Sequence, residues 1–438
     1  MAQVTLGLIG LGTVGTGVVR LLRENGDLIE KKTGIRFRLK RIADRGIREF
    51  REFALDGYEL SESADAVLDD PEIEIAIELI GGYEPARTYL LQAIERGKHV
   101  VTANKALLAR FGGEIFALAD KVGVEVGFEG SVAGTVPIIR VLLDGLAANR
   151  IEKVAGIVNG TTNYILTKMT EEGVSYEAAL AQATAAGFAE ADPSLDVDGE
   201  DAAHKLAILA TLAFGVRPEA KDIHVEGIRG LGLEDIRFAR ESGYVLKLLA
   251  IGRKTNGHVE LRVHPALVPK THPLASVRNE FNAVFVRGDA SRETMYYGRG
   301  AGQMPTASAV LSDIIEIAER SLHDCRRPEC RATTRARKRS LYWSSDRFRP
   351  VDDIRSRYYL RFPIVDAPGA IGTLTTILGR HGVSIAAVHA SIVDAAANKG
   401  RIEILTHEAL ESSVKASCAE IGKTGILREK ERLIRVEE

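Results

Sequence analysis

A glycine-rich turn directly follows the first apolar run of this chain. Residues 4–9 read Val-Thr-Leu-Gly-Leu-Ile, and residues 10–15 read Gly-Leu-Gly-Thr-Val-Gly before a helical pattern begins. In a strand–turn–helix unit, Gly10 permits the tight turn, Gly12 lets a pyrophosphate approach the backbone, and Gly15 lets helix and strand pack closely. A glycine-rich turn without a ligand would have the same composition. However, the segment Gly10–Gly15 follows the first strand of an alternating strand–helix pattern, and this position favours a dinucleotide-binding site with the phosphates at the start of the helix.

The pattern that follows alternates short apolar strands with helical segments. Such alternation predicts a parallel sheet with helices on both faces, an α/β domain of the Rossmann type. From about residue 135, helical runs come together and strand-like runs follow, which predicts an α+β domain for substrate binding and dimerisation. The expected strands of the first part are residues 4–9, 36–43, 73–80, 99–102 and 124–128, and its helices are 13–23, 85–95 and 114–121. The second part has expected helices at residues 161–171, 176–185 and 199–214, and strands at 244–253, 259–268 and 283–287.

The end of the chain forms a third pattern. Residues 357–438 read strand, helix, strand, strand, helix, strand, the order of a ferredoxin-like domain, and we expect this tail to fold separately. An arginine-rich stretch with little apolar periodicity precedes it. A solvated linker is the simpler interpretation; nucleic-acid contact is the alternative, but aromatic side chains are not interleaved with the arginines. The predicted domains are residues 1–134, with a helix of 303–322 packing back against them, then 135–302, a basic linker at 323–356, and 357–438.

Composition excludes several classes of protein. A chain of 438 residues is too long to fold around one ordinary hydrophobic core. Its net charge of −2 lacks the positive excess that binding to nucleic acid or to an anionic membrane requires. No apolar run approaches the ~20 residues that span a bilayer, and the N-terminus lacks the features of a secretory signal. Cys325, Cys330 and Cys418 form no disulfide framework, which fits a reducing cytoplasm; the first two, even with His323 nearby, are weakly spaced for zinc. We therefore expect a cytoplasmic protein that binds neither nucleic acid nor a membrane.

Two strand ends carry residues that could meet the cofactor. Asp44 and Arg45 follow the second expected strand, where an acidic residue binds the ribose hydroxyls of NAD and an arginine favours the 2′-phosphate of NADP. Since both are present, the choice between NAD and NADP stays open. Thr102 and Lys105 follow the fourth strand, and ligands of an open parallel sheet bind at the carboxyl ends of its strands. Lys105 is therefore either placed to meet cofactor or substrate, or is a solvated lysine of a first helical turn.

An acidic segment follows the first two helices of the second part. Glu190, Asp196, Asp198 and Asp201 precede Lys205, and Asp198, Asp201 and Lys205 are spaced to share one helical face. One interpretation is an exposed salt bridge with acidic residues in a first helical turn. The other is a lysine acid whose pKa is set by a carboxylate neighbour, beside a carboxylate that binds a substrate ammonium.

The loop at residues 129–137, Glu-Gly-Ser-Val-Ala-Gly-Thr-Val-Pro, joins the fifth strand to a helix. A bend that offers carbonyl oxygens and one carboxylate could hold a monovalent cation. A plain loop is the simpler interpretation.

Together these segments resemble homoserine dehydrogenase over nearly all of residues 1–322. The resemblance implies reversible reduction of L-aspartate 4-semialdehyde to L-homoserine with NAD or NADP, in threonine, methionine and isoleucine biosynthesis, by a homodimer or homotetramer. It rests on the fingerprint, Glu78-Leu79-Ile80-Gly81-Gly82, Thr102-Ala103-Asn104-Lys105, Val158-Asn159-Gly160-Thr161-Thr162-Asn163, the segment from Gly187 to Lys205, and Tyr297-Gly298-Arg299-Gly300-Ala301-Gly302.

The same resemblance implies roles for single residues. Lys205 would donate a proton to the aldehyde oxygen, with Asp201 orienting it, and Lys105 would bridge cofactor and substrate. Glu190 would bind the substrate ammonium, and Asp196 would help hold the substrate or Lys205. The cofactor would be lined by Gly10, Gly12, Thr13, Val14, Gly15, Arg45, Thr102, Lys105 and Gly302, and a sodium ion would be bound by Glu129 and by backbone oxygens of Val132, Gly134 and Val136.

The tail resembles an ACT domain. The resemblance rests on Asp366-Ala367-Pro368-Gly369 before a helix and His381-Gly382-Val383-Ser384-Ile385 at a helix-to-strand turn. It implies an amino-acid effector bound at a paired interface. The related pattern usually has a glutamine at the end of that strand, where this chain has Val388-His389-Ala390.

Two other functions fit parts of the sequence. Another semialdehyde dehydrogenase, the one that acts on aspartate semialdehyde, would need a nucleophilic cysteine in its substrate domain, and all cysteines here lie beyond residue 322. A catalytically inactive regulator that binds an amino acid through its tail would not need Lys105, Glu190, Asp201 and Lys205 together.

Overall fold

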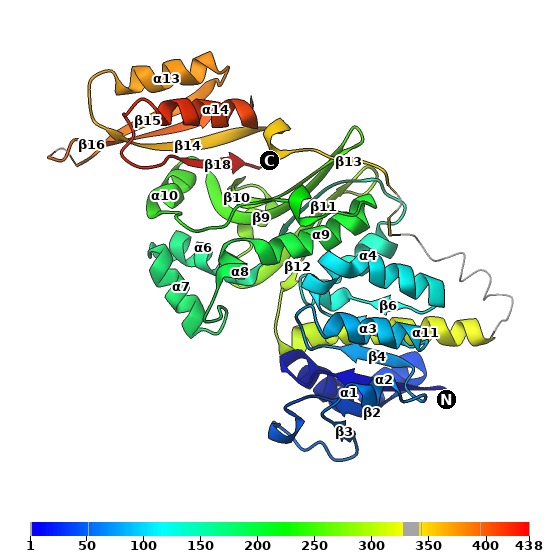
Figure 1. Ribbon diagram of the computed structural model, residues 1–438. Coiled ribbons are helices and arrows are strands. Elements are labelled where there is room, and N and C mark those ends of the chain that lie inside the picture. The colour runs from blue at the N-terminus through cyan, green and yellow to red at the C-terminus, as the bar shows by residue number, and fades with distance from the viewer. Residues whose placement is uncertain (1, 51, 327–340, 343, 395, 438) are drawn as a thin grey trace. The chain divides into compact units, whose positions relative to one another are not determined.

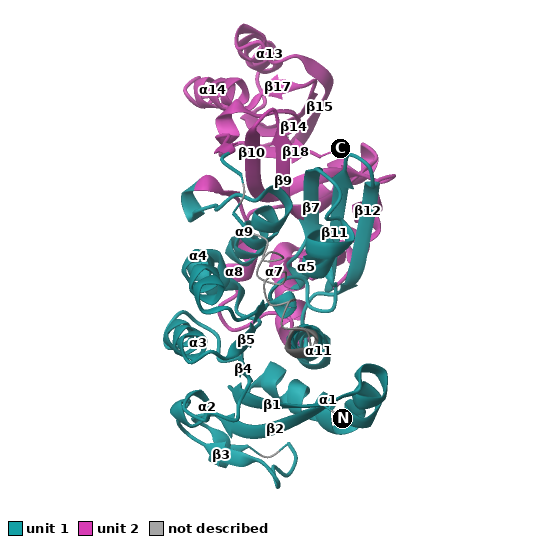
Figure 2. Cartoon of the chain, turned by 90° about the vertical axis from the view of Figure 1, so that its right-hand side faces the viewer, with its two compact units in different colours: residues 1–160, 200–221, 280–345 teal, residues 161–199, 222–279, 346–438 magenta. Residues whose placement is uncertain are grey.

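The computed structural model describes the chain except for residues 1, 51, 327–340, 343, 395 and 438 and the side chains of residues 323–326 (Figure 1). Most of the arginine-rich stretch, and the weak zinc candidate with its two cysteines, lie outside the described residues. The chain divides into two compact units, residues 1–160, 200–221 and 280–345, and residues 161–199, 222–279 and 346–438 (Figure 2). Each unit draws on more than one predicted domain, and the predicted domain boundaries stay a prediction.

The first unit contains the predicted parallel sheet with its helices. The strands are β1 (Ala2–Ile9), β2 (Ile35–Ala43), β3 (Glu59–Ser61), β4 (Ile75–Glu78), β5 (His99–Thr102) and β6 (Val126–Gly127), and the helices are α1 (Thr13–Thr33), α2 (Asp65–Leu68), α3 (Ala86–Glu95), α4 (Lys105–Val122) and α11 (Gln303–Arg326). The strand order is β3-β2-β1-β4-β5-β6, and every neighbouring pair is parallel. Leu6, Val18 and Ile314, from β1, α1 and α11, share one buried apolar cluster, so α11, the helix predicted at residues 303–322, packs against β1 and α1.

The remainder of the first unit is a smaller antiparallel sheet with one long helix. Its elements are α5 (Ile138–Arg140), a π-helical turn (Val141–Gly145), β7 (Ile151–Ile157), α9 (Glu200–Phe214), β11 (Phe281–Gly288) and β12 (Arg292–Arg299). β11 pairs with β7 on one side and with β12 on the other. α9 is rich in alanine and leucine, strong helix formers, and buries most of its length, from Leu206 to Phe214.

The second unit combines helices with a sheet that continues into the tail. Its elements are α6 (Gly160–Glu172), α7 (Tyr176–Ala185), α8 (Ser194–Val197), β8 (His224–Val225), α10 (Leu233–Glu241), β9 (Tyr244–Thr255), β10 (His258–Pro269), β13 (Arg347–Phe348), β14 (Arg355–Val365), α13 (Ala370–Arg380), β15 (Ile385–Asp394), β16 (Lys399–Thr406), β17 (Ala409–Leu410), α14 (Glu411–Gly422) and β18 (Arg432–Val436). The antiparallel order β18-β14-β16-β15 confirms the ferredoxin-like arrangement of the tail. β18 also pairs in parallel with β10, Ala266 opposite Arg435 and Leu267 opposite Val436.

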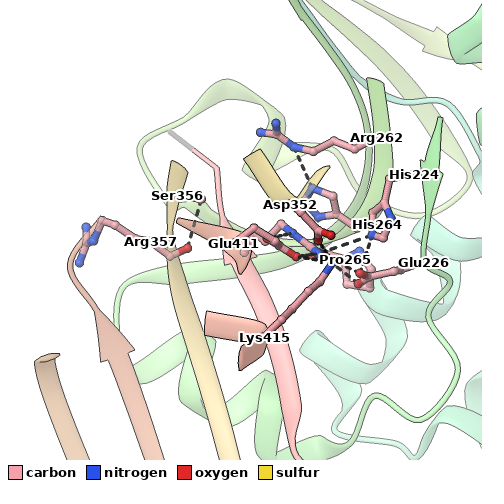
Figure 3. Close-up of polar contacts among 11 residues, drawn as sticks. His224, Glu226, Arg262, His264, Pro265, Asp352, Ser356, Arg357, Glu411 and Lys415 are labelled. Atoms are coloured by element: carbon pink, nitrogen blue, oxygen red, sulfur yellow. Dashed lines mark hydrogen bonds and ion pairs between the residues drawn. The ribbon is translucent and has the colours of Figure 1, made fainter. Parts of the chain in front are cut away.

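A network of buried charges lies at the junction of β10 and β18. Arg435 donates to Glu226 at 2.9 and 3.1 Å and to Glu411, the first residue of α14, at 2.9 Å. Arg262 of β10 donates to Glu437 at 2.7 Å. Figure 3 draws Glu226 and Glu411 at this junction, with Arg262 beside His264, to which its Nε donates at 3.1 Å. Because Arg435 is only 1% exposed, its charge depends on these carboxylates rather than on water.

Six strands were not predicted from the sequence: β3, β7, β8, β12, β13 and β17. Four of them have only two or three residues, β12 keeps every residue at least partly exposed, and in β7 the charged pair Glu152 and Lys153 interrupts the apolar pattern after the first residue. Two predicted helices are longer than expected: α1 continues to Thr33 and α4 begins at Lys105. The added part of α1 is polar and largely exposed, so it carries little periodicity. Throughout the described part of the chain, no helix is both long and apolar enough to cross a bilayer.

Candidate active site

The glycine fingerprint lies where β1 ends and α1 begins. Gly10 has a φ of +101°, and a Cβ there would lie 2.7 Å from the Leu79 carbonyl oxygen. A Cβ on Gly15 would lie 2.1 Å from the Gly10 carbonyl oxygen, whereas one on Gly12 would meet open space. Larger residues at Gly10 and Gly15 would therefore force the loop and helix apart, and Gly12 leaves room for a ligand. A cleft of about 400 Å³, within the usual range for ligand sites, is lined here by residues that include Gly10, Gly12, Asp44, Arg45 and Ile80.

Two neighbouring residues after β2 have different surroundings. Asp44 Oδ2 accepts a hydrogen bond from the Leu11 amide at 2.6 Å, and its Oδ1 accepts one from the Gly46 amide at 2.7 Å. The carboxylate thus fixes the fingerprint loop. Arg45 lines the same cleft, and among the described residues its guanidinium has no hydrogen-bond or ion-pair partner. Gly302, also predicted to line the cofactor, directly precedes α11 with a φ of +127°.

A buried carboxylate links two loops at the carboxyl ends of β4 and β5. Glu78 accepts hydrogen bonds from Thr102 Oγ1 at 2.7 Å and from the Ile80 amide at 2.8 Å. Burial raises the pKa of Glu78, although these donors oppose the shift. Thr102 Oγ1 in turn accepts from the Asn104 amide at 3.0 Å, and the Asn104 side chain caps α4. This chain of contacts holds Lys105, the first residue of α4.

Asp201 lies between the two predicted catalytic lysines. Its Oδ1 is 2.9 Å from Lys105 Nζ, and its Oδ2 is 2.7 Å from Lys205 Nζ and 2.8 Å from Asn159 Nδ2. Lys205 Nζ also donates to the Val158 carbonyl oxygen at 2.6 Å. The side chains of Asp201 and Lys205 are 7% and 10% exposed, and that of Lys105 is 42% exposed. Burial would raise the pKa of Asp201, but the two ammonium groups outweigh it and hold this pKa well below its usual range, so Asp201 is ionised.

Helix α9 supplies two members of this cluster. Asp201 lies in its first turn, where a carboxylate is favoured by the helix dipole, and Lys205 follows four residues later on the same face. The spacing predicted that Asp198 shares this face, and that prediction was wrong, because α9 begins only at Glu200. Asp198 instead pairs with Arg229.

The predicted substrate residues, Glu190 and Asp196, belong to the second unit. Asp196 lies in α8, and its Oδ2 is 2.9 Å from Thr161 Oγ1, which also donates to the Phe188 carbonyl oxygen at 2.7 Å. Glu190 is exposed in the loop between α7 and α8. Asn159 and Thr161 were not predicted to have a role of their own, although the polar run Asn-Gly-Thr-Thr-Asn at the start of α6 was a signal for both.

The predicted cation loop is built around a buried carboxylate. Glu129 accepts hydrogen bonds from the Ile139 and Arg140 amides, both at 2.9 Å, and its own amide donates to Asp313 Oδ2 at 2.8 Å. Burial raises the pKa of Glu129, and the two amides oppose the shift. Gly134, in the bend that follows, has a φ of +55°. No cluster of three or more His, Cys, Asp or Glu side chains suited to a metal occurs in the described residues. The predicted cation loop would be another kind of site, because it would use one carboxylate together with backbone carbonyl oxygens.

Comparison with known proteins identifies relatives of the whole chain. The family model for homoserine dehydrogenase matches residues 137–315, and the model for the NAD-binding domain of homoserine dehydrogenase matches residues 10–129. The homoserine dehydrogenase of Neisseria gonorrhoeae is 41% identical, over 100% of this chain and 99% of its own length. That of Synechocystis is 42% identical, over 99% of each chain.

Solved structures give the same relationship. A crystal structure of homoserine dehydrogenase from Thiobacillus denitrificans superposes with a TM-score of 0.92 at 41% identity, covering 100% of this chain and 99% of that one. A hyperthermophilic archaeal homoserine dehydrogenase mutant in complex with NADPH is similar over 72% of this chain and 98% of its own, with a TM-score of 0.63 and 28% identity.

Proposed function

The chain belongs to the homoserine dehydrogenase family, as an NAD(P)-dependent oxidoreductase that interconverts L-aspartate 4-semialdehyde and L-homoserine, and from this premise we propose how its residues divide the reaction. When bound, NAD(P)H supplies the hydride that adds to the aldehyde carbon. Negative charge then grows on the former aldehyde oxygen, which must gain a proton. The protein has to supply that proton, hold the amino-acid part of the substrate and position the cofactor.

Lys205 supplies the proton. The observation that carries this proposal is the pair formed by Lys205 Nζ and the ionised Asp201, 2.7 Å apart in a buried setting. A neighbouring carboxylate fixes the direction of the ammonium group, which is what a proton donor needs. Lys105, on the other oxygen of Asp201 and more exposed, would bridge cofactor and substrate.

Glu190 and Asp196 bind the substrate. An ammonium group is best recognised by a carboxylate through charge-assisted hydrogen bonds, and Glu190 presents an exposed one. The contact of Asp196 with Thr161 supports a role in holding the substrate, because the hydroxyl limits the carboxylate to one orientation.

The cofactor cleft favours NADP over NAD. Asp44 would recognise the ribose hydroxyls of NAD, but both of its oxygens already accept backbone amides. Arg45 in the same cleft offers a guanidinium that can pair with a 2′-phosphate. Gly10, Gly12 and the first turn of α1, with Thr13 and Val14, would take the pyrophosphate, and Thr102, Lys105 and Gly302 would lie toward the nicotinamide.

A steady-state assay of homoserine oxidation with each cofactor tests these assignments. We expect a higher kcat/KM with NADP than with NAD. Arg45→Gln should lower the ratio of the two kcat/KM values by about 10–100-fold, because a charge-assisted hydrogen bond contributes about 1.5–3 kcal/mol. An unchanged ratio, with Arg36→Gln as a matched control on β2, would exclude Arg45 as the reader of the 2′-phosphate.

Four further features of the enzyme stay predictions. Glu129 and the carbonyl oxygens of Val132, Gly134 and Val136 would supply only oxygen ligands, the kind that hard cations take, and the proposed sodium ion rests on this donor chemistry. Replacing sodium by a bulky organic cation in the assay buffer tests it. The amino-acid effector of the tail, the homodimer or homotetramer and the cytoplasmic location are predictions of the same standing.

A further inference from the structure

The segment between β4 and α3, residues 79–85, forms one wall of the proposed cofactor cleft. The lining residues from this wall are Leu79, Ile80, Gly81, Glu84 and Pro85. Gly81 and Gly82 have φ angles of +75° and +71°, and a Cβ on either would meet nothing within 4 Å. Two consecutive glycines without close neighbours leave the backbone free to sample other conformations. The wall therefore needs support from another element to keep one shape.

The residue after the two glycines contacts helix α4. Tyr83 is not among the described residues that line the cleft, and its ring meets that of Phe111 edge to face, with the ring centroids 5.9 Å apart and an angle of 81° between the planes. The guanidinium group of Arg110 lies 5.1 Å from the centroid of Tyr83 and 5.2 Å from that of Phe111. Edge-to-face aromatic pairs and a cation over a ring are both attractive arrangements. Since Tyr83 is 36% exposed, these contacts hold its ring rather than deep burial.

A second bridge joins α3 to α4 directly behind the wall. Arg87 donates to both oxygens of Glu114, from Nε at 2.8 Å and from Nη2 at 2.6 Å, which is the paired geometry that arginine and carboxylate prefer. Its guanidinium also lies 5.1 Å from the centroid of Phe111, and its Nη1 donates to Glu84 at 3.3 Å. The carboxylate of Glu84, which lines the cleft, thus has a cation beside it.

Helix α4 also holds the wall at its own first turn. Asn104 Nδ2 donates to the Gly82 carbonyl oxygen at 2.6 Å, while Asn104 Oδ1 caps the helix by accepting from the Leu107 amide at 3.2 Å. The next residue is Lys105, the proposed bridge between cofactor and substrate. One helix therefore supports the cofactor wall at two adjacent residues, Gly82 and Tyr83, and also carries a lysine of the active site.

We propose that Tyr83 is a positioning residue for the cofactor, because its ring fixes the glycine-containing wall to α4 in the conformation that binds NADP. This role rests on the proposed assignment of the cleft to the cofactor. The hydroxyl of Tyr83 has no hydrogen-bond partner among the described residues, so the ring makes the contact. Without the ring, the wall would have to be ordered when the cofactor binds, and this ordering lowers affinity. The chemistry at Lys205 would follow unchanged once the cofactor is bound.

Titration of the full chain with NADPH, followed by the fluorescence of the bound cofactor, tests this role without turnover. We expect Tyr83→Ala to raise the Kd for NADPH by about 5–50-fold, the loss of one aromatic pair and one cation–ring contact, and Tyr83→Phe to restore the wild-type value. At saturating NADP, kcat and the KM for homoserine should stay at wild-type values in Tyr83→Ala. A wild-type Kd in Tyr83→Ala, with an unchanged melting curve, would overturn the role of Tyr83 alone. A wild-type chain that binds no NADPH would overturn the cofactor cleft and this role with it.

Substitutions on α4 show whether the effect passes through the ring contact. Phe111→Leu should also weaken NADPH binding, and the loss in the double variant with Tyr83→Ala should be smaller than the product of the two single losses, because residues in contact are not additive. Phe116→Leu is the matched control, since this aromatic residue of the same helix packs on Phe128 with ring centroids 5.2 Å apart, and it should keep the wild-type Kd. Fully multiplicative losses in the double variant, or an equal loss in Phe116→Leu, would show that the contact between Tyr83 and Phe111 does not position the wall.

Discussion

The chemistry at the scale of single residues depends on one carboxylate shared by two lysines. Asp201 is nearly buried, and an ionised carboxylate in that position needs both opposite charges and good hydrogen bonds to be tolerated. Lys105 and Lys205 supply the charges, and Asn159 supplies a further hydrogen bond. Because the three charged groups share contacts, a substitution at any one of them changes the environment of the other two.

Removing the proposed proton donor should affect catalysis more than binding. We expect Lys205→Ala to lower kcat by roughly 10²–10⁴, the range for general acid–base groups, with a much smaller change in KM for homoserine. Steady-state kinetics in both directions measure this. Lys221→Ala, whose side chain is 76% exposed, is the control and should keep wild-type turnover. Wild-type kcat in Lys205→Ala would rule out the assigned role.

Removing Glu190, the carboxylate proposed to bind the substrate ammonium, should have a different effect on the kinetics. Glu190→Ala should raise KM for homoserine by about 10–100-fold, since a charge-assisted contact of about 1.5–3 kcal/mol with the ammonium is lost. The KM for the cofactor should stay constant in the same titrations. If instead the cofactor KM rises and that for homoserine does not, the residue has been assigned to the wrong ligand.

Sequence identified the residue types of this site better than their contacts. The fingerprint and the i, i+4 pair of Asp201 and Lys205 are local patterns, so spacing alone could suggest them. The contact of Lys105 with Asp201 joins two helices far apart in the chain, and only the fold brings them together. The hydrogen bond from the Leu11 amide to Asp44 could not be predicted from the sequence either, because it depends on the register between the fingerprint loop and the end of β2.

At the scale of elements, long periodic segments were predictable and short or polar ones were not. Strand β5 and helix α7 have the bounds that the sequence predicted. β12, by contrast, exposes alternate residues on a surface sheet, and its stability comes from pairing with β11 rather than from burial. Side chains that fix one element to another were also missed. The clearest is Lys247 of β9, which donates to Asn163 Oδ1 of α6 at 3.0 Å and to the Val277 carbonyl oxygen.

This buried lysine should make stability depend on pH. Burial lowers the pKa of Lys247 from 10.5 to about 8, so between these values the unfolded chain binds more protons than the folded one. The free energy of unfolding therefore rises with pH across this window. Denaturant unfolding of wild type and Lys247→Met should show their stability difference shifting by about 2 kcal/mol in favour of wild type between pH 7.5 and 10. The exposed Lys221→Met should show no such shift, and a constant difference for Lys247→Met would mean that Lys247 does not titrate in this range.

At the scale of the whole molecule, the tail shares structure with the chain that precedes it. It has an apolar cluster of its own, with Tyr358, Phe362 and Leu374, and its separate folding stays a prediction. The parallel pairing of β18 with β10 and the buried network of Arg435 and Arg262 add contacts that no sequence pattern revealed. They join residues about 170–210 positions apart, and each needs both partners to keep a buried charge compensated.

Truncation after residue 356 separates these two contributions. The proposed proton donor and the cofactor cleft lie outside the tail, so we expect the fragment to fold and to oxidise homoserine. It should nevertheless melt at a lower temperature, because Glu226 loses Arg435 and Arg262 loses Glu437. Loss of one partner from a buried pair costs about 3–5 kcal/mol, which corresponds to roughly 6–20 °C for a unit of this size. Full-length Arg435→Met should show part of the same decrease, whereas Arg432→Met, on the same strand but more exposed, should not. A fragment that melts like the full chain would show that the network adds no stability, and an insoluble fragment would show that the tail is part of the catalytic core.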